Sequence, residues 1–375
     1  MTILYCLAGT FNSGGMERIV IDKANWFVSN GHNVVIVTTE QNNRPNFFPI
    51  DERVRRIDLN IMYSETNKDN VVKKFFRRNK KNRLHKRYLK NVLNVEKPDV
   101  VISTCGNELF FLPDIKDGSK KVAEIHFSRW FRIQFNRNGI WKLIDKYLTR
   151  YDKIRLSKFD AFVCLTEEDK RNWGNLDNLY VIPNFIEPVS NTLASLTQKC
   201  FIAVGRLSYQ KGYDRMIEAW RIVNKEYSDW KLEIYGGGEL YDDLCAMING
   251  YGLSKSIIIN RPVSNIHDKY LTSSGLLLSS HYEGLPMVLL EAMSCGLPVV
   301  SFNCQCGPAD VIENGINGFL VEDGDVSVFA DCIKQLIENE KMRSDMGLNA
   351  YEISRRFNKE VVMNCWLRLL LGLVR

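Results

Sequence analysis

One stretch of the chain, residues 275–300, strongly restricts the folds available to this sequence. It begins with an apolar run typical of a buried strand, passes through a polar loop to Pro286, and ends in a second apolar run after Pro298. Proline is tolerated where a helix begins, and residues 287–293 are mostly strong helix formers. Gly296 is a typical helix terminator. The stretch therefore predicts a strand, a loop, a helix and another strand, the repeating unit of a parallel sheet.

Two carboxylates lie around the start of this predicted helix. Glu283 comes just before it, and Glu291 follows about a turn and a half into the helix, where it is expected to face inward. The first backbone N–H groups of a helix lack partners within the helix and form a ready site for phosphate. The pattern therefore predicts two carboxylates beside a candidate phosphate site.

The same alternation of strands and helices runs through the 375 residues, a length that favours two domains. A linker is expected near residues 183–197. We therefore predict an α/β protein with two Rossmann-like parallel sheets, in domains 1–187 and 188–355. The predicted strands are 2–8, 33–39, 54–59, 98–103, 121–125, 160–165, 179–182, 200–204, 232–235, 257–260, 275–279 and 315–320.

Several predicted strands end in residues suited to ligand binding, because ligands of open parallel sheets collect at the carboxyl ends of strands. Gly14 and Gly15 precede a helix and allow close backbone approach, although their context is not the G-x-G-x-x-G of a dinucleotide fold. His126 ends another strand, and Arg206 and Lys211 could flank a diphosphate. Taken singly, each also fits a plain structural role: a helix entry, a core histidine and two exposed cations.

Together these motifs resemble glycosyltransferase family 4, whose members are retaining enzymes of the GT-B fold. The resemblance rests on the filled segment 283–293, on Gly-Gly-Met-Glu-Arg at 14–18, and on Gly205-Arg206-Leu207 with Gln-Lys-Gly at 210–212. Gly-Pro at 307–308 resembles many bacterial polysaccharide and lipopolysaccharide transferases. The resemblance implies that the two domains face a central cleft and close over the donor, and that residues 356–375 cross back to the first domain.

The resemblance also implies roles for individual residues. Glu283 would bind the donor sugar hydroxyls, Glu291 the ribose hydroxyls, and His126 the side of the sugar that carries the primary hydroxyl. The charge of the leaving diphosphate would be stabilised without metal or cofactor by Arg206, Lys211, the Gly14 and Gly15 amides and the helix start near Met287. The turn at Arg261 and Val263 would lie beside the base, and Gly284 and Leu285 complete the predicted donor-binding set.

The function expected from this resemblance is transfer of a hexose or N-acetylhexosamine with retention of anomeric configuration. The donor would be a nucleoside-diphosphate sugar, a UDP-sugar above all. The acceptor would be a glycan or lipid-linked glycan in capsule, O-antigen or lipopolysaccharide synthesis. Two alternatives remain open: a GT-B sugar-nucleotide epimerase, and a non-catalytic nucleotide-binding scaffold.

Charge points to a further partner, because the net charge of +6 is concentrated in a basic first half. Residues 71–90 hold ten Lys and Arg and no acid, interleaved with apolar side chains. This segment is either a solvated helix face or a surface helix for anionic phospholipid. Nucleic acid is not expected, since no recognised motif accompanies the charge. Segment 127–132 alternates aromatics with arginines, which suggests core, an acceptor-side loop or a membrane-facing loop.

Other features argue against a membrane-spanning, secreted or metal-dependent protein. No apolar run approaches the ~18 residues that a membrane span needs, and the N-terminus lacks a signal-peptide pattern. The ten cysteines are scattered like reduced thiols, and the lone pair Cys304 and Cys306 is a poor zinc site. Residues 323–325 spell D-x-D but are expected to cap a helix. We expect a cytoplasmic protein, peripheral at the inner face of the cytoplasmic membrane.

Overall fold

The computed structural model describes residues 1–133, 139–187, 192–263 and 265–375, which divide into two compact units. Unit 1 comprises Met1–Leu165, Lys170–Ile182 and Met363–Arg375. Unit 2 comprises Thr166–Asp169 and Pro183–Val362. Part of the predicted linker, residues 188–191, lies outside the described residues, so the boundary after residue 187 stays a prediction.

Unit 1 is built on a parallel sheet with the strand order β3-β2-β1-β4-β5-β6-β7, whose first six strands follow the Rossmann arrangement. Its central strands are buried on both faces, as expected for parallel strands covered by helices. The described strands are β1 (Thr2–Leu7), β2 (Asn33–Thr38), β3 (Arg55–Asp58), β4 (Val100–Ser103), β5 (Lys120–Glu124), β6 (Ala161–Cys164) and β7 (Leu179–Val181).

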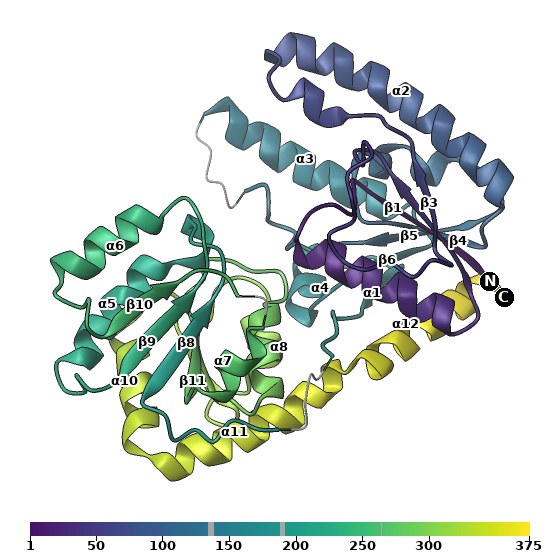
Figure 1. The fold of residues 1–375 in the computed structure, drawn as a ribbon. Helices are drawn as coiled ribbons and strands as arrows, with labels where there is room; N and C mark the ends of the chain where they lie inside the picture. Colours follow the sequence, from purple (N-terminus) through teal and green to yellow (C-terminus); the bar gives the residue numbers. More distant parts are fainter. Residues whose placement is uncertain (134–138, 188–191, 264) are drawn as a thin grey trace. The chain divides into compact units, whose positions relative to one another are not determined.

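Helices cover both faces of this sheet (Figure 1). Leu4 and Cys6 pack in one cluster with Leu89 of α2 and Leu156 of α3, and because side chains alternate along a strand, Tyr5 points to the opposite face. The described helices are α1 (Gly15–Ser29), α2 (Val71–Glu96), α3 (Ile140–Leu156) and α4 (Glu167–Trp173), with short 3-10 turns η1 (Tyr63–Thr66), η2 (Asn107–Phe110) and η3 (Leu112–Asp114).

Unit 2 repeats the plan with a parallel sheet of order β10-β9-β8-β11-β12-β13. A cluster of buried residues from β8, α5 and α10 forms its main core, with Trp220 and Phe329 fully buried. The strands are β8 (Cys200–Val204), β9 (Lys231–Tyr235), β10 (Ile257–Asn260), β11 (Gly275–Leu278), β12 (Val299–Phe302) and β13 (Gly318–Val321).

The helices of unit 2 include the one predicted between Pro286 and Gly296, which runs over Met287–Ser294 as α8. The others are η4 (Tyr209–Lys211), α5 (Tyr213–Asn224), α6 (Tyr241–Gly250), α7 (His267–Leu271), α9 (Pro308–Val311), α10 (Val326–Glu338), α11 (Glu340–Ser354) and η5 (Arg355–Phe357). The last helix, α12 (Lys359–Val374), starts in unit 2 and ends in unit 1. Two Rossmann-like parallel sheets confirm the predicted fold class.

Both sheets reverse their strand order next to the first strand of the unit, between β1 and β4 and between β8 and β11. At such a switch point the two neighbouring loops leave in opposite directions and open a crevice for ligands. The loops that follow β8 and β11 are the ones that carry Lys211 and Glu283. The topology therefore brings two of the predicted site segments to one place.

Helix α2 confirms that the basic segment is helical, and it attaches to unit 1 mainly through its second half. His85, Leu89 and Leu93 are its buried residues, one turn apart. The first half exposes two valines and two phenylalanines, among them Phe75 and Phe76 at 62% and 68% exposure. The segment has no acid of its own, but Glu65 and Asp69 just before it form ion pairs with Lys73, Arg77 and Lys81.

His85 is the polar residue at the centre of this attachment. Its ring packs edge-on against Phe111 at 5.0 Å, and its Nδ1 lies 3.1 Å from the Tyr63 hydroxyl. Burial lowers the pKa of His85 from 6.5 to about 4, because the protonated ring would lose its hydration. At pH values between about 4 and 6.5, His85 is mostly protonated in the unfolded chain and mostly neutral in the folded chain.

We therefore expect acid to destabilise unit 1 through His85. The free energy of unfolding should fall as the pH drops from about 6.5 to about 4, and this group alone should contribute about 3 kcal/mol. Urea unfolding at pH 7 and pH 4.5 measures the loss, and an NMR titration of the ring gives the pKa directly. A His85→Asn variant is the control. If it loses as much stability in acid as the parent, His85 is not the responsible group.

Candidate functional site

The central contact of unit 2 joins the loops that follow β8 and β11. The Lys211 ammonium lies 2.6 Å from Oε1 of Glu283, and the Ser280 hydroxyl donates to the same oxygen at 2.5 Å. The Glu283 side chain is 7% exposed and that of Lys211 18%. A carboxylate this buried needs its partners, so the pair is held in a fixed geometry that is still open on the lysine side.

Close backbone packing and a buried arginine fix this pair. Gly212 follows Lys211 with φ +57°, and a Cβ there would lie 2.3 Å from the Ser279 carbonyl oxygen. Arg215, on the first turns of α5, donates to the carbonyls of Ser279 and Ser280 and to the carboxylate of Asp323. The start of α5 and the end of β11 are thereby tied together, and substitution of Gly212 would push them apart.

Glu291 lies on α8, which follows the Glu283 loop in the same connection between β11 and β12. Its Oε2 accepts a hydrogen bond of 3.2 Å from the buried Tyr270 hydroxyl, and the carboxylate is half-buried. Pro286, the N-cap residue of α8, makes no side-chain cap hydrogen bond, and its carbonyl accepts from the Leu289 amide. Leu285 is buried, whereas Gly284 and Met287 are partly accessible. Glu291 and the helix start at Met287 therefore lie in one element, α8.

The remaining predicted donor residues of unit 2 are more exposed. Arg206 is exposed directly after β8. The turn after β9 packs closely against the backbone just before Arg206. A Cβ on Gly236 would lie 1.9 Å from the Gly205 carbonyl oxygen. Arg261 and Val263 are exposed after β10, with Val263 at 41%. These side chains are accessible to a ligand, and their roles stay predictions.

In unit 1, Gly14 and Gly15 begin α1 as predicted. The Glu17 carboxylate folds back over this turn, so that a Cβ on Gly14 would lie 2.2 Å from Glu17 Oε2, and Asn12 donates to Oε1 at 3.1 Å. A Cβ on Gly15 meets open space. The helix start is therefore already faced by one carboxylate of the protein itself.

His126 lies just past the end of β5, as predicted, above a buried charge pair. Its Nε2 is 3.0 Å from Oε1 of Glu124, and the same oxygen accepts a hydrogen bond from the ammonium of Lys23 on α1. Lys23 and Glu124 are fully buried, and the Lys23 ammonium lies 4.0 Å from the centre of the Trp366 ring. The Glu124 carboxylate thus binds the lysine and lies close to the histidine.

The electrostatics of this group follow from its burial. Burial would raise the pKa of Glu124, but the charges of Lys23 and His126 outweigh that effect and lower it to about 2. Burial also lowers the pKa of Lys23, and Glu124 opposes the shift. In unit 2, burial and the nearby Glu283 charge raise the pKa of the Tyr213 hydroxyl. Unit 1 therefore keeps the ionised Glu124 carboxylate close to Lys23 and to His126, a candidate ligand-binding residue.

The structure brings Lys211 and Glu283 into contact, which the sequence did not predict, and it gives Glu291 a tyrosine partner. The supporting residues Lys23, Glu124 and Arg215 were missed, because a lone charged residue on an amphipathic helix or strand carries no sequence signal of burial. The D-x-D at 323–325 is structural, as predicted: Asp325 accepts from the Val328 amide at 3.0 Å and caps α10. Asp323 binds Arg215.

In the described ranges, no group of three or more His, Cys, Asp or Glu side chains is placed to hold a metal ion. The ten cysteines are free thiols. Among the helices that the structure describes, none has both the length and the apolar character needed to cross a bilayer.

Comparison with known proteins identifies the class to which this fold and site belong. Residues 13–189 match the family described as Glycosyltransferase Family 4, and residues 188–353 match Glycosyl transferases group 1. The structure is similar to that of a mutant of S. aureus TarM in complex with Fondaparinux, alpha-GlcNAc-glycerol and UDP, with a TM-score of 0.78 at 16% identity over 98% of this chain and 99% of that one. The protein is thus a glycosyltransferase of the GT-B fold.

Two full-length relatives agree with this assignment. An uncharacterized glycosyltransferase of Haemophilus influenzae is 29% identical over 366 residues, covering 96% of this chain and 97% of the relative. The amylovoran biosynthesis glycosyltransferase AmsD of Erwinia amylovora is 28% identical over 384 residues, covering 97% and 98%. With both halves matched, the chain belongs to glycosyltransferase family 4, as its motifs predicted.

The buried pair in unit 1 generates a stability prediction. Lys23→Met leaves the Glu124 carboxylate buried without its main partner, so we expect the free energy of unfolding to fall by about 3–5 kcal/mol. Adding Glu124→Gln should recover most of that loss, because it removes the uncompensated charge. Urea unfolding of the parent, both single variants and the double variant measures the coupling. Additive losses in the double variant would contradict this account of the pair.

Proposed function

We propose that this protein transfers a hexose or N-acetylhexosamine from a UDP-sugar to a hydroxyl of a glycan or lipid-linked glycan, with retention of configuration. The product would enter a bacterial cell-surface polysaccharide such as capsule, O-antigen or lipopolysaccharide. The relative AmsD is named for amylovoran biosynthesis, and the TarM complex contains UDP, which supports the choice of pathway and of donor.

The observation that carries the proposal is the Lys211–Glu283 pair at the switch point of the unit 2 sheet. A lysine ammonium has three donors, and Glu283 occupies one of them. The others are free to bind the oxygens of a diphosphate. The second oxygen of Glu283 is left to accept from sugar hydroxyls. One pair can therefore hold the sugar and its leaving group in a fixed relation.

The leaving diphosphate gains negative charge as the glycosidic bond breaks, and the residues proposed to stabilise it are cations and amides. Arg206 is exposed after β8, and Pro286, the N-cap residue of α8, makes no side-chain hydrogen bond to the first amides of the helix. Such pre-positioned donors stabilise developing charge without reorganisation. By this proposal the protein needs no metal ion. The Gly14 and Gly15 amides and His126 keep the diphosphate and sugar roles that the family resemblance gives them.

No side chain is assigned as a covalent nucleophile. In the proposed mechanism the leaving phosphate accepts the proton of the attacking acceptor hydroxyl on the same face of the sugar, as the family resemblance implies. Glu291, fixed by Tyr270, would bind the ribose hydroxyls. Measuring UDP release from UDP-sugars with and without acceptor extracts separates this reaction from an epimerase or a non-catalytic scaffold.

Glu291 provides the sharpest test of the donor site. Glu291→Ala removes the proposed acceptor for the ribose hydroxyls, so we expect UDP affinity to fall by about 1–3 kcal/mol, or roughly 5- to 150-fold. Calorimetric titration with UDP, run in EDTA because no metal is invoked, gives the affinity. Glu322→Ala, an exposed carboxylate of the same unit, is the matched control. Unchanged affinity in a folded Glu291→Ala protein rejects the ribose assignment.

We further propose that α2 holds the enzyme at the inner face of the cytoplasmic membrane. Val72, Phe76, Lys80, Arg83 and Arg87 follow one another at helical spacing and are all exposed. Of the described residues, no carboxylate forms an ion pair with the three cations in this row. Apolar and cationic groups on one exposed face are the features of a helix that adsorbs to anionic lipid.

The three unpaired cations are therefore the ones to change. Replacing Lys80, Arg83 and Arg87 by Gln should weaken binding to anionic vesicles by about 3 kcal/mol, roughly 150-fold, since each cation near the surface contributes about 1 kcal/mol. Vesicle sedimentation at low and high salt measures this. The control replaces three exposed lysines outside the row, Lys68, Lys97 and Lys158, by Gln. Equal losses in both variants, or no binding by the parent, would show that α2 is only a solvated face.

A further inference from the structure

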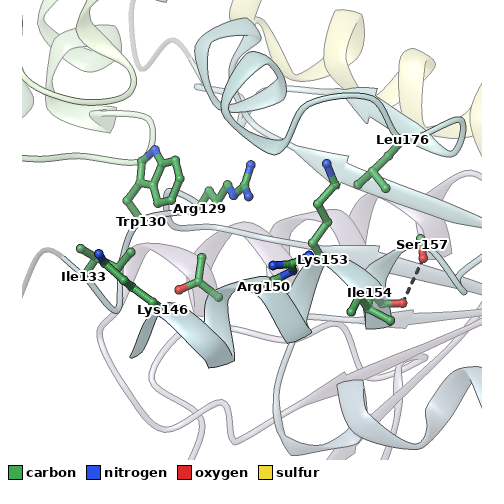
Figure 2. A pocket seen from close by; sticks show the side chains of 10 residues that line it. Arg129, Trp130, Ile133, Lys146, Arg150, Lys153, Ile154, Ser157 and Leu176 are labelled. Carbon is green, nitrogen blue, oxygen red and sulfur yellow. Dashed lines mark hydrogen bonds between the residues drawn. The ribbon is translucent and has the colours of Figure 1, made fainter. Parts of the chain in front are cut away.

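A pocket of about 650 Å³ lies within unit 1, between the loop that follows β5 and helix α3. Four cations line it, Arg129, Lys146, Arg150 and Lys153, and no carboxylate does. Figure 2 shows Arg129 and Trp130 on one side and the side chains of Arg150 and Lys153 extending from α3 on the other. The rest of the lining is apolar or carries hydroxyls: Trp130, Ile133, Thr149, Ile154, Ser157 and Leu176.

Helix α3 separates its charges by face. Its acids Asp145 and Asp152 are 2% and 4% exposed, and Asp152 binds Arg132 at 3.0 Å. Lys146, Arg150 and Lys153 follow at spacings of four and three residues, which places like charges side by side on the pocket face, an arrangement that weakens a helix. Of the described residues, no carboxylate pairs with these three cations, and the sequence of residues 134–138 contains no acid.

The fourth cation, Arg129, is held in place by aromatic stacking. Its guanidinium lies 4.7 Å from the centre of the Trp130 ring and 5.3 Å from that of Trp173, and it donates a hydrogen bond to the Asn172 carbonyl. Trp173 is itself buried against Phe162. An arginine fixed in this way loses little conformational freedom when it binds an oxyanion, so the pocket is organised before a ligand arrives.

We propose that this pocket binds a phosphate group carried by the acceptor substrate. A phosphate offers several charged oxygens to the four cations, and charge-assisted hydrogen bonds of this kind are the strong ones. The volume exceeds what one phosphate fills, and Trp130, Ile154 and Leu176 supply an apolar wall for the group bonded to it. That the phosphate belongs to the acceptor rests on the proposed transferase function, whereas the binding of an anion in this pocket does not.

Two kinds of acceptor present this same chemistry: a lipid-borne diphosphate and a glycan that contains phosphodiesters. Farnesyl diphosphate serves as the probe for the first and a glycerol phosphate oligomer for the second, with inorganic pyrophosphate as the bare anion. Calorimetry is run with saturating UDP, so that the diphosphate positions of unit 2 are filled. The stronger of the two probes identifies the source of the phosphate.

The test variant replaces Lys146, Arg150 and Lys153 by Gln, and the control is the variant with Lys68, Lys97 and Lys158 replaced by Gln, which carries the same change in charge. Loss of charge-assisted hydrogen bonds should weaken probe binding by at least about tenfold in the test variant and leave the control unchanged. UDP affinity should be the same in all three proteins, and matching urea unfolding transitions show that unit 1, which carries the substitutions, is folded.

The proposal is overturned if no probe binds to the parent, if the parent and the test variant bind the probe with equal affinity, or if the control loses as much affinity as the test variant. Binding of pyrophosphate alone, with neither ester probe bound, also overturns it, because the site would then hold only an adventitious ion. A protein that binds a probe in this pocket but does not bind UDP contradicts the proposed function and leaves the pocket intact, so the two failures are distinguishable.

Discussion

The ion pair between Lys211 and Glu283 is the contact on which the arrangement of unit 2 depends. It joins two loops that leave neighbouring parallel strands, β8 and β11, and it is backed by a serine hydroxyl and by the carbonyl bonds of Arg215. Removing a charge pair from water is costly, so the pair persists only because its surroundings are fixed. A rigid pair with spare donors is also what a charged ligand needs, so stability and the proposed binding rest on the same atoms.

Unit 1 has the same central strand order but places its charges differently. Lys23 and Glu124 are fully buried, and His126, just past the end of β5, lies against the same carboxylate. The exposed charge of unit 1 lies instead on α2 and α3, whose outer faces are cationic. The two units thus share a topology and differ in the charge they present, a difference on which the proposed donor, acceptor and lipid contacts rest.

The elements of this fold are local in sequence, which is why apolar runs and helix signals predicted them. The helix between Pro286 and Gly296, the cap at Asp325 and the helical basic segment could all be predicted in this way. Contacts between distant residues could not. Lys211 meets Glu283 across 72 positions, and Lys23 meets Glu124 across 101. The acids that neutralise part of α2 precede the helix, so a count within residues 71–90 overestimated its free charge.

The cation–π contact of Lys23 with Trp366 has a consequence for how the chain is made. Trp366 and Leu370 are fully buried and belong to unit 1, yet they are synthesised after the whole of unit 2. During translation, Lys23 and Glu124 therefore stay incompletely covered until residues 363–375 are made. Unit 2 has all of its residues before that point. Unit 1 can reach its final stability only after residues 363–375 have been made, so its completion follows that of unit 2.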